Sequence, residues 1–208
     1  MTDYKVYENV IFGSNVSIHP FAVVGKPPQV PGGTTVHKPK LGNTPTIIGD
    51  NCVIGANSVI YQGCKVGKNT LIGDGARLRD KAVIGDHCII GMGTKVGPNT
   101  IIHDKVKIMD LCNIAGNMII EYGVFIAQGT MCANDKEMGR GSSIVFPGPI
   151  IRRYATIGAN ATILPGVEIG ENAIIGAGAL IVENVPPRVV MVSPKAIYLR
   201  DVREEELK

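Results

Sequence analysis

The stretch "MCANDKEMGR" at residues 131–140 places an amide, a carboxylate and a guanidinium within seven positions, at Asn134, Asp135 and Arg140. A carboxylate can hold an amine and accept its proton, and a neighbouring amide can orient the same group. An amine that attacks an acyl carbon needs this alignment, and the oxyanion that forms needs N–H donors. Asn and Asp also form turns readily. On these two residues alone, the turn is the favoured interpretation.

A six-residue period surrounds this stretch. From Ile48 to Met131 the chain divides into fourteen consecutive hexads, each of which opens with Ile, Val or Leu. The fifth position of a hexad is usually small. The register resumes at Ile157, and a shorter piece begins at Phe12. A short fixed period predicts a solenoid, because each unit can bury its apolar face only against its neighbours.

The pattern aliphatic–Gly–x–x–small–x resembles the hexapeptide-repeat acyltransferases over about half of the chain. The resemblance implies an all-β, left-handed parallel β-helix of triangular section, with three hexads per coil, usually assembled as a trimer. We expect this domain to span residues 1–190, with loops at 26–45 and 132–156 where the repeat is interrupted. Ser193 and Pro194 are typical of a helix start, which predicts a short C-terminal α-helix as a cap over residues 191–208.

Eighteen residues per coil would place residues eighteen apart directly above one another, about one strand spacing or ~4.8 Å away. Four cysteines share the fifth, inward position and should be small core residues. They are Cys52, Cys64, Cys88 and Cys112. Cys132 lies outside this register and is more typical of a packed loop thiol than of a reactive one, although of the five it should be the first to react with thiol reagents.

The residue before each opening aliphatic should point outward, because side chains alternate along a strand. Two of the three predicted outer faces are mainly apolar. One carries Ile47, Lys65, Val83, Ile101 and Ile119, and the next carries Val53, Leu71, Ile89, Lys107 and Phe125. The third, with Val59, Arg77, Lys95 and Asn113, is largely polar. Two apolar faces on one prism favour a homotrimer, although single exposed aliphatics are common.

The segments "GVFIAQGTMCANDKEMGR", "ATIGANATILPGVEIG" and "IGAGALIVENVPP" are similar to the nucleotide-sugar N-acyltransferases of this superfamily. The resemblance implies that Asn134 and Asp135 contact an amino-sugar at a subunit interface and orient its amine. It also implies substrate contacts from Gln128 and Arg140. The co-substrate acetyl-CoA would lie along the later coils.

Tight backbone positions in those coils could donate N–H groups to the oxyanion, and nearby cations could meet the CoA phosphates. The cofactor-binding residues that the resemblance implies are Ala159, Gly176, Ala177, Arg188 and Lys195, and Arg152–Arg153 could serve in place of the last two. The family usually closes with a Gly-x-Pro-Ala-Lys/Arg turn, whereas this chain reads "VSPKAIY". The sequence therefore leaves open which of these cations bind the CoA phosphates.

Many hexapeptide acyltransferases use a histidine base, and no histidine follows His103. Glu121 is eighteen residues on, so the pair could stack and raise the basicity of the imidazole. An exposed structural ion pair would look the same. The four histidines are separated by 18, 50 and 16 residues, unlike the close ligands of the carbonic anhydrases that share this fold, so we expect no metal.

The 208 residues suit one domain with an aliphatic core, since 45% are hydrophobic and only 5% aromatic. No apolar run reaches the ~20 residues that span a bilayer, and the N-terminal sequence lacks the features of a secretory signal. With five cysteines and no C-x-x-C pair, a reduced, cytoplasmic protein is indicated. A net charge of +3 suits an anionic small molecule and gives no indication of a nucleic acid or membrane partner.

The sequence therefore predicts a CoA-dependent acyltransferase that moves acetyl from acetyl-CoA to the amine of a nucleotide-linked amino-sugar. One alternative is O-acetylation of a sugar or another small acceptor. The other is a β-helix module that only assembles or binds, although such a module has no need of the long interruption after Cys132.

Overall fold

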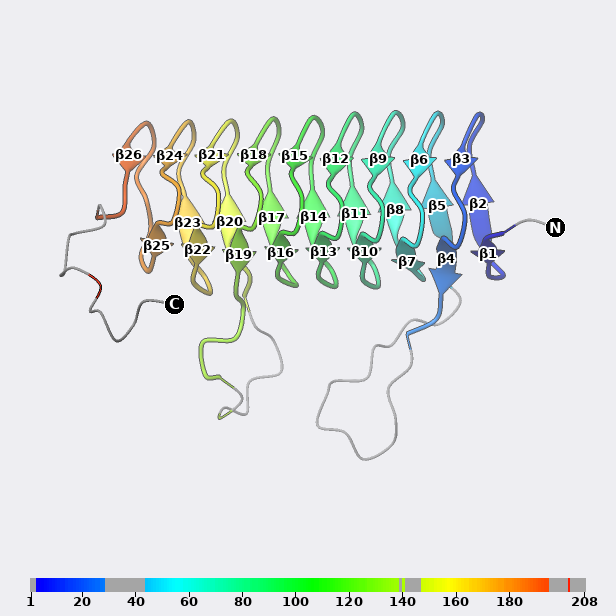
Figure 1. Ribbon diagram of the computed structural model, residues 1–208, viewed down its shortest axis with the longest axis horizontal. Coiled ribbons are helices and arrows are strands. Elements are labelled where there is room, and N and C mark those ends of the chain that lie inside the picture. Colours follow the sequence, from blue (N-terminus) through cyan, green and yellow to red (C-terminus); the bar gives the residue numbers. More distant parts are fainter. Residues whose placement is uncertain (1–2, 29–43, 139, 141–146, 195–201, 203–208) are drawn as a thin grey trace.

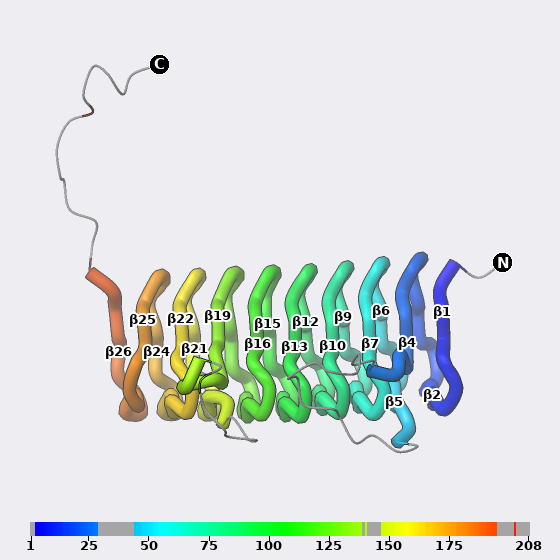
Figure 2. Tube along the Cα trace, turned by 90° about the horizontal axis from the view of Figure 1, so that it is seen from below, coloured from blue at the N-terminus to red at the C-terminus, as the bar shows by residue number. Residues whose placement is uncertain are grey.

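The computed structural model describes residues 3–28, 44–138, 140, 147–194 and 202. Short strands follow one another into three different parallel sheets, so the chain winds into a β-helix whose coils stack along one axis (Figure 1). Turned by 90°, the coils remain evenly stacked, with the first coil and the last at opposite ends (Figure 2).

We call the three sheets faces A, B and C, in the order in which the chain first meets them. Face A contains β1 (Lys5–Val6), β4 (Val23–Lys26), β7 (Val59–Tyr61), β10 (Arg77–Leu78), β13 (Lys95–Val96), β16 (Asn113–Ile114), β19 (Met131–Cys132), β22 (Thr162–Ile163) and β25 (Leu180–Ile181). Face B contains β2 (Val10–Phe12), β5 (Thr46–Ile48), β8 (Lys65–Val66), β11 (Val83–Ile84), β14 (Ile101–Ile102), β17 (Ile119–Ile120), β20 (Ile150–Ile151) and β23 (Glu168–Ile169). Face C contains β3 (Ser17–Ile18), β6 (Val53–Ile54), β9 (Leu71–Ile72), β12 (Ile89–Ile90), β15 (Lys107–Ile108), β18 (Phe125–Ile126), β21 (Thr156–Ile157), β24 (Ile174–Ile175) and β26 (Val190–Met191).

The register between coils is eighteen residues, as the hexads predict; Arg77 pairs with Lys95, for example. Where the repeat is interrupted, residues that pair between neighbouring coils are further apart in the sequence. Ile119 pairs with Ile150, an offset of 31 that leaves an insertion of 31 − 18 = 13 residues. Strand β20 and the first residue of β21 lie within the predicted loop 132–156, so this interruption is shorter than predicted and falls between β19 and β20. Both β4 and β19 belong to face A, so the two departures leave from the same edge (Figure 1).

The interior is a stack of aliphatic side chains. The opening residues of successive hexads, such as Ile48, Ile54 and Ile60, are fully buried. Their preceding neighbours on each strand point outward, because side chains alternate across a strand. Each coil thus buries its inward residues only by stacking, which is what the hexad period predicts.

The fourth position of each hexad carries the turn between faces. Its backbone has a positive φ, which Asn and Gly tolerate best, as at Asn51 (55°) and Asn57 (57°). Tyr154 adopts the same conformation at 58°. Its ring lies under Gly123, where an added Cβ would be 2.8 Å from the ring. Gly123 is therefore needed both for its own φ of 70° and for the space that Tyr154 occupies.

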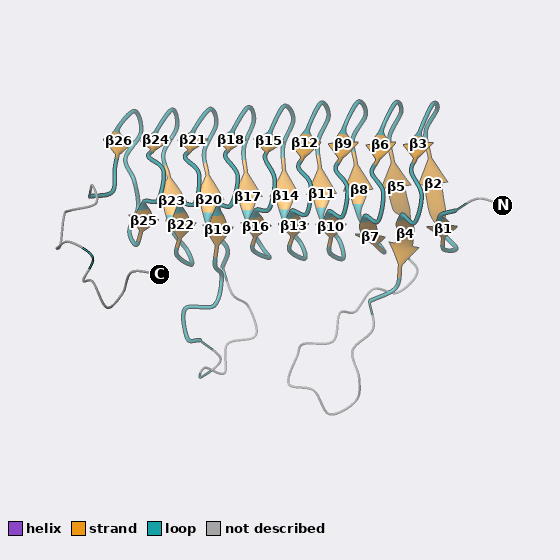
Figure 3. Cartoon of the chain, in the orientation of Figure 1, coloured by secondary structure: helices purple, strands orange, loops and turns teal. Residues whose placement is uncertain are grey.

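The described residues contain strands and loops and no helix (Figure 3). Accordingly, no described segment is a helix of the length and apolarity needed to cross a membrane. The predicted C-terminal helix falls almost wholly on residues 195–201 and 203–208, which are outside the described residues, as is Lys195.

Candidate functional site

A groove of about 370 Å³ runs along the edge at which the chain passes from face A to face B. We call this edge the A/B edge. Five successive coils line it, from the coil of Arg79 to that of Thr162. The lining residues are Arg79, Lys95, Gly97, Pro98, Asn113, Ile114, Ala115, Gly116, Met131, Cys132, Ala133, Asn134, Asp135 and Thr162. The predicted acceptor residues Asn134 and Asp135 therefore do line a cavity.

Asn134 continues the solenoid register, because it follows Asp80, Pro98 and Gly116 at steps of eighteen residues. Its side chain is half-buried, and Nδ2 donates a hydrogen bond to the carbonyl of Gly116 at 3.3 Å. The amide is thus held against the coil below, while the chain beyond it leaves the solenoid. Its Oδ1 makes no hydrogen bond within the described part of the chain and can accept one from a ligand.

Asp135 forms a turn with the residues that follow it. Its Oδ1 accepts a hydrogen bond from the backbone N–H of Glu137 at 2.9 Å. This is the turn that the sequence offered as the alternative to a chemical role, yet the same residue lines the groove. The turn fixes the carboxylate at the mouth of the cavity, so the two interpretations do not exclude each other. Arg140 is exposed and is not part of the lining.

The predicted cofactor residues lie on a different edge. Gln128, Ala159 and Ala177 share one column of turns between faces C and A, the C/A edge, with Gly176 beside it. Gln128 is exposed and does not reach the groove of Asn134. The width of face A separates these residues from Asn134 within one chain.

Some backbone N–H groups along the C/A edge are held by an aspartate of the next coil: Ala56 N–H by Asp74 at 2.8 Å, and Met92 N–H by Asp110 at 2.7 Å. Ala177 lies above Ala159 in the next coil, and Ser193 lies above Ala177. Neither Ala177 nor Ser193 has a carboxylate to hold the N–H group below it. These two late N–H groups make no hydrogen bond to the described part of the chain and remain available to a ligand.

The third edge, between faces B and C, holds His103, Glu121 and Arg152 in successive coils. The predicted His103–Glu121 pair is not formed. Glu121 instead accepts hydrogen bonds from Arg152 Nη1 at 2.8 Å and from the N–H of Arg153 at 3.0 Å. Arg152 Nε also binds Glu168 at 2.7 Å. The insertion between β19 and β20 shifts the register and brings this arginine above Glu121, which hexad counting across the gap could not show.

These contacts set the charge of the B/C edge. Partial burial would raise the pKa of Glu121, but the hydrogen bonds from Arg152 and Arg153 outweigh it and lower that pKa. The hydrogen bond from Arg152 likewise lowers the pKa of Glu168, and the two carboxylates raise the pKa of the guanidinium. A cavity of about 660 Å³ adjoins this cluster and extends to Pro186–Pro187. Arg188, predicted to meet CoA phosphate, is exposed at the same edge.

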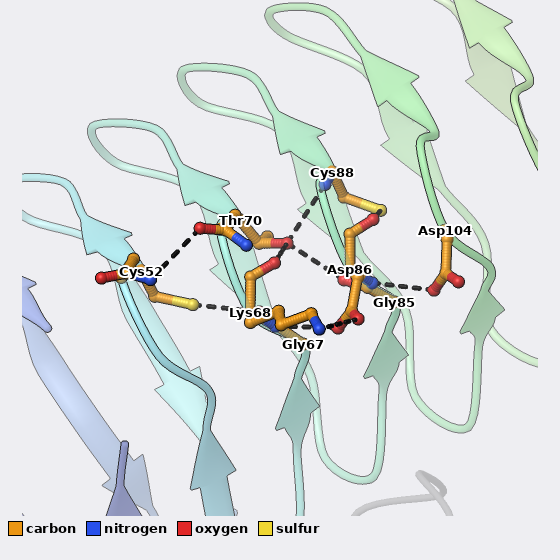
Figure 4. Close-up of polar contacts among 10 residues, drawn as sticks. Cys52, Gly67, Lys68, Thr70, Gly85, Asp86, Cys88 and Asp104 are labelled. Atoms are coloured by element: carbon orange, nitrogen blue, oxygen red, sulfur yellow. Dashed lines mark hydrogen bonds and ion pairs between the residues drawn. The ribbon is translucent and has the colours of Figure 1, made fainter. Parts of the chain in front are cut away.

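The cysteines are buried, and four of them belong to a ladder of small polar side chains. The ladder is clearest along the B/C edge (Figure 4), where Cys52 Sγ donates to Gly67 O at 3.0 Å and Thr70 Oγ1 donates to Gly85 O at 3.0 Å. Thr70 Oγ1 also accepts the N–H of Cys88 at 3.1 Å. Where the fifth hexad position is Cys or Thr, as in this ladder, its side chain can donate to a carbonyl of the next coil.

The expectation for Cys132 is wrong. It lies on β19, pairs with Ile163 and occupies the inward position of a hexad-opening aliphatic. It is 2% exposed, and burial raises the pKa of its thiol to about 12. The register therefore extends one residue further than the sequence analysis assumed.

Within the described residues, no three His, Cys, Asp or Glu side chains are grouped as metal ligands would be. Neither Arg79 nor Lys95 was predicted as a site residue, although both line the groove. A signal was present, because Arg77 and Lys95 are the cations of the polar outer face and are eighteen residues apart.

Comparison with known proteins agrees with this architecture. Residues 45–80, 63–98 and 148–182 match the family described as bacterial transferase hexapeptide (six repeats). These segments carry repeats similar to those of that family, and the predicted left-handed β-helix is confirmed. No curated protein matches it in sequence.

Two solved structures share the fold. A UDP-N-acetylglucosamine acyltransferase from Bacteroides fragilis has a TM-score of 0.63 at 21% identity, over 89% of this chain and 68% of that one. A UDP-N-acetylglucosamine O-acyltransferase from Moraxella catarrhalis has a TM-score of 0.50 at 18% identity, over 90% and 71% of the two chains. At these identities the likeness concerns the fold.

Proposed function

We propose that this protein is an acyltransferase that moves an acetyl group from acetyl-CoA to the amine of a nucleotide-linked amino-sugar. The observation that carries the proposal is the groove at the A/B edge, where a held amide and a held carboxylate, Asn134 and Asp135, meet on a transferase-type hexapeptide scaffold. The relatives in fold are named as acyltransferases of a nucleotide sugar, which agrees with this substrate class.

In the proposed reaction the ammonium of the acceptor binds beside Asp135, with Asn134 accepting a second hydrogen bond. The amine loses a proton to the carboxylate, directly or through water, and attacks the thioester carbon. A C–N bond forms, and the C–S bond of the tetrahedral intermediate breaks. The nitrogen gives its second proton to the departing CoA thiolate, which leaves as the free thiol, and the proton held by Asp135 passes to solvent. The contribution of these residues is to align a neutral amine and to receive its proton, which is typically worth about 10²- to 10⁴-fold in rate.

The acyl donor is proposed to lie along the C/A edge of the late coils. There the N–H groups of Ala159 and Ala177 have no carboxylate partner and can bind the oxyanion or the pantetheine amides. Gly176, beside this column, lets the next coil pack closely, since an added Cβ would lie 3.2 Å from the carbonyl oxygen of Met191. Lys195 is a proposed partner of the CoA phosphates, because it is close in sequence to these coils, whereas Arg188 lies on the B/C edge and is not proposed here.

Acceptor and donor residues occupy different edges, so we propose that the site is completed between copies in a homotrimer. Faces B and C are the apolar ones, with Ile101 and Phe125 41% and 36% exposed. If face B of one copy packs on face C of the next, the B/C edges meet at the three-fold axis. The A/B edge of each copy then lies beside the C/A edge of its neighbour. Asn134 and Asp135 of one copy would thereby face Ala159 and Ala177 of the partner.

The test is transfer of isotopically labelled acetyl from acetyl-CoA, with product masses read by mass spectrometry. The acceptors are a nucleotide-linked amino-sugar and the same compound with a hydroxyl in place of the amine. We expect labelled product from the amine only. Product from the hydroxyl compound alone would establish an O-acetyltransferase instead. Absence of product from both, together with no binding of CoA, would favour a non-catalytic module.

A further inference from the structure

The groove at the A/B edge carries opposite charges at its two ends. Arg79 and Lys95 line the end nearer the N-terminal coils, and Asp135 lines the other end beside Asn134. A ligand that fits this arrangement is negative at one end and positive at the other.

Arg79 is held in place before any ligand arrives. Its guanidinium lies 5.1 Å from the ring centre of Tyr61, and its Nη2 is 3.3 Å from Oδ1 of Asp80, which is only 4% exposed. Its Nε is buried and has no hydrogen-bond partner among the described residues. The buried Nε is out of reach of a ligand, but the Arg79 side chain is 36% exposed, and its accessible part can meet an anion in the groove.

Lys95 has an unfavourable neighbour as well. It is exposed on face A, it is the register partner of Arg77 on the adjacent strand, and neither cation makes an ion pair with a described residue. Like charges directly opposite on neighbouring strands repel. Among the described residues, the only ion pair that Arg77, Arg79 or Lys95 makes is that of Arg79 with Asp80, so this end of the groove is positive.

The spacing of the two ends suits one ligand. Lys95 is on β13 and the chain leaves for Asp135 after β19, two strand spacings further on, or about 10 Å. This is comparable with the distance from an amine on a pyranose ring to the diphosphate on its anomeric oxygen. We propose that Arg79 and Lys95 bind the diphosphate of the acceptor and so place its amine at Asn134 and Asp135.

This assignment rests on the proposed function and deepens it. It fixes the orientation of the acceptor, with the nucleotide toward the N-terminal coils and the sugar toward the C-terminal coils. It also makes the diphosphate a requirement, so that the free amino-sugar should be a poor acceptor.

Binding of UDP and of inorganic pyrophosphate tests the subsite without any turnover. We expect Lys95→Gln to weaken both by about 10- to 100-fold, the usual effect of removing one hydrogen bond to a charged group. Lys95→Arg should restore binding, because it keeps the charge. Arg77→Gln is the matched control: it removes the same charge from the neighbouring strand but not from the groove lining, and should change binding by less than about threefold.

The outcomes separate the two proposals. If Lys95→Gln binds both probes as tightly as the wild type, or if the wild type binds neither, the anion subsite is wrong even where acetyl transfer is observed. Equal losses of affinity in Lys95→Gln and Arg77→Gln would also overturn the proposed subsite. Such losses would come from the overall positive charge of face A and not from a contact in the groove. If binding depends on Lys95 but no acetyl transfer occurs with any acceptor, the subsite stands and the proposed reaction fails.

Discussion

Arg152 Nη1 lies 2.8 Å from Glu121 Oε1, so the carboxylate that the sequence assigns to His103 is held by an arginine of the next coil. The same guanidinium bridges to Glu168 and joins three coils across the point where the insertion re-enters the solenoid. The cluster is thus an ion-pair clamp on the B/C edge, one face away from the groove of Asn134.

The first prediction follows for His103. Without Glu121 to orient it, and on an edge remote from the acceptor groove, the imidazole has no role in the proposed reaction. His103→Ala should retain turnover within about twofold of the wild type, well below the 10²- to 10⁴-fold that removal of a general base costs. Steady-state rates of acetyl transfer measure this. Loss of turnover in this variant, with its melting temperature unchanged, would move the base to the B/C edge.

The clamp itself predicts a pH-dependent stability. Because the pKa values of Glu121 and Glu168 are lowered in the folded chain, their ion pairs stabilise it above the unfolded pKa of about 4.3 and cease to do so as the pH falls through the folded values. Arg152→Gln should therefore melt below the wild type near neutral pH. The effect should be about 1 kcal/mol or less, because all three side chains are partly exposed.

Thermal melts of both proteins from pH 7 to pH ~3 test this dependence, and the difference between them should shrink toward the acid end. A difference that stays constant over this range would mean that Arg152 acts by packing rather than by charge.

The sequence predicts the fold well because the core, turn and register positions of the hexad all indicate the same structure. Ile48 and its equivalents give the core, Asn51 and Asn57 give the turns, and the eighteen-residue offset gives the ladder register. The site is predicted only in part. Asn134 could be placed because it keeps the register, whereas the partner of Glu121 could not, because the insertion after β19 changes which residue lies above it. Arg79 was missed because its importance comes from neighbours on other coils, Tyr61 among them.

The cysteines provide a further prediction, revised by the structure. All five thiols are buried, and burial raises the pKa of Cys64 and Cys132 to about 12 and that of Cys88 to about 11. Thiolate is the reactive form, so none of them, Cys132 included, should react with a thiol reagent at pH 8 until the protein unfolds. Quantitative labelling with and without denaturant measures this. Rapid native labelling of Cys132 alone would mean that β19 opens in solution.

The assembly prediction concerns faces B and C. The protein should scatter light as a trimer, three times 22.1 kDa. Ile101→Lys places a charge on apolar face B and should release monomers, because a buried unpaired ammonium is costly. Leu180→Lys is the matched control on face A, where the side chain is 62% exposed, and it should remain trimeric. A wild type that is monomeric at micromolar concentration would contradict both the trimer and the site shared between copies.

The last prediction separates the turn at Asp135 from its charge. Asp135→Asn keeps an Oδ1 that can accept the N–H of Glu137, so the turn and the melting temperature should survive. The charge is lost, however, and with it the partner of the ammonium and the proton acceptor. Turnover should fall about 10²- to 10⁴-fold. The affinity for CoA should be unchanged, because the proposed donor site lies on the C/A edge. Asn134→Ala should also lower turnover, but it removes the hydrogen bond to Gly116 as well, so its melting temperature must be compared. If Asp135→Asn is fully active while Asp135→Ala is not, the residue serves only to make the turn, and the acceptor amine must lose its proton elsewhere.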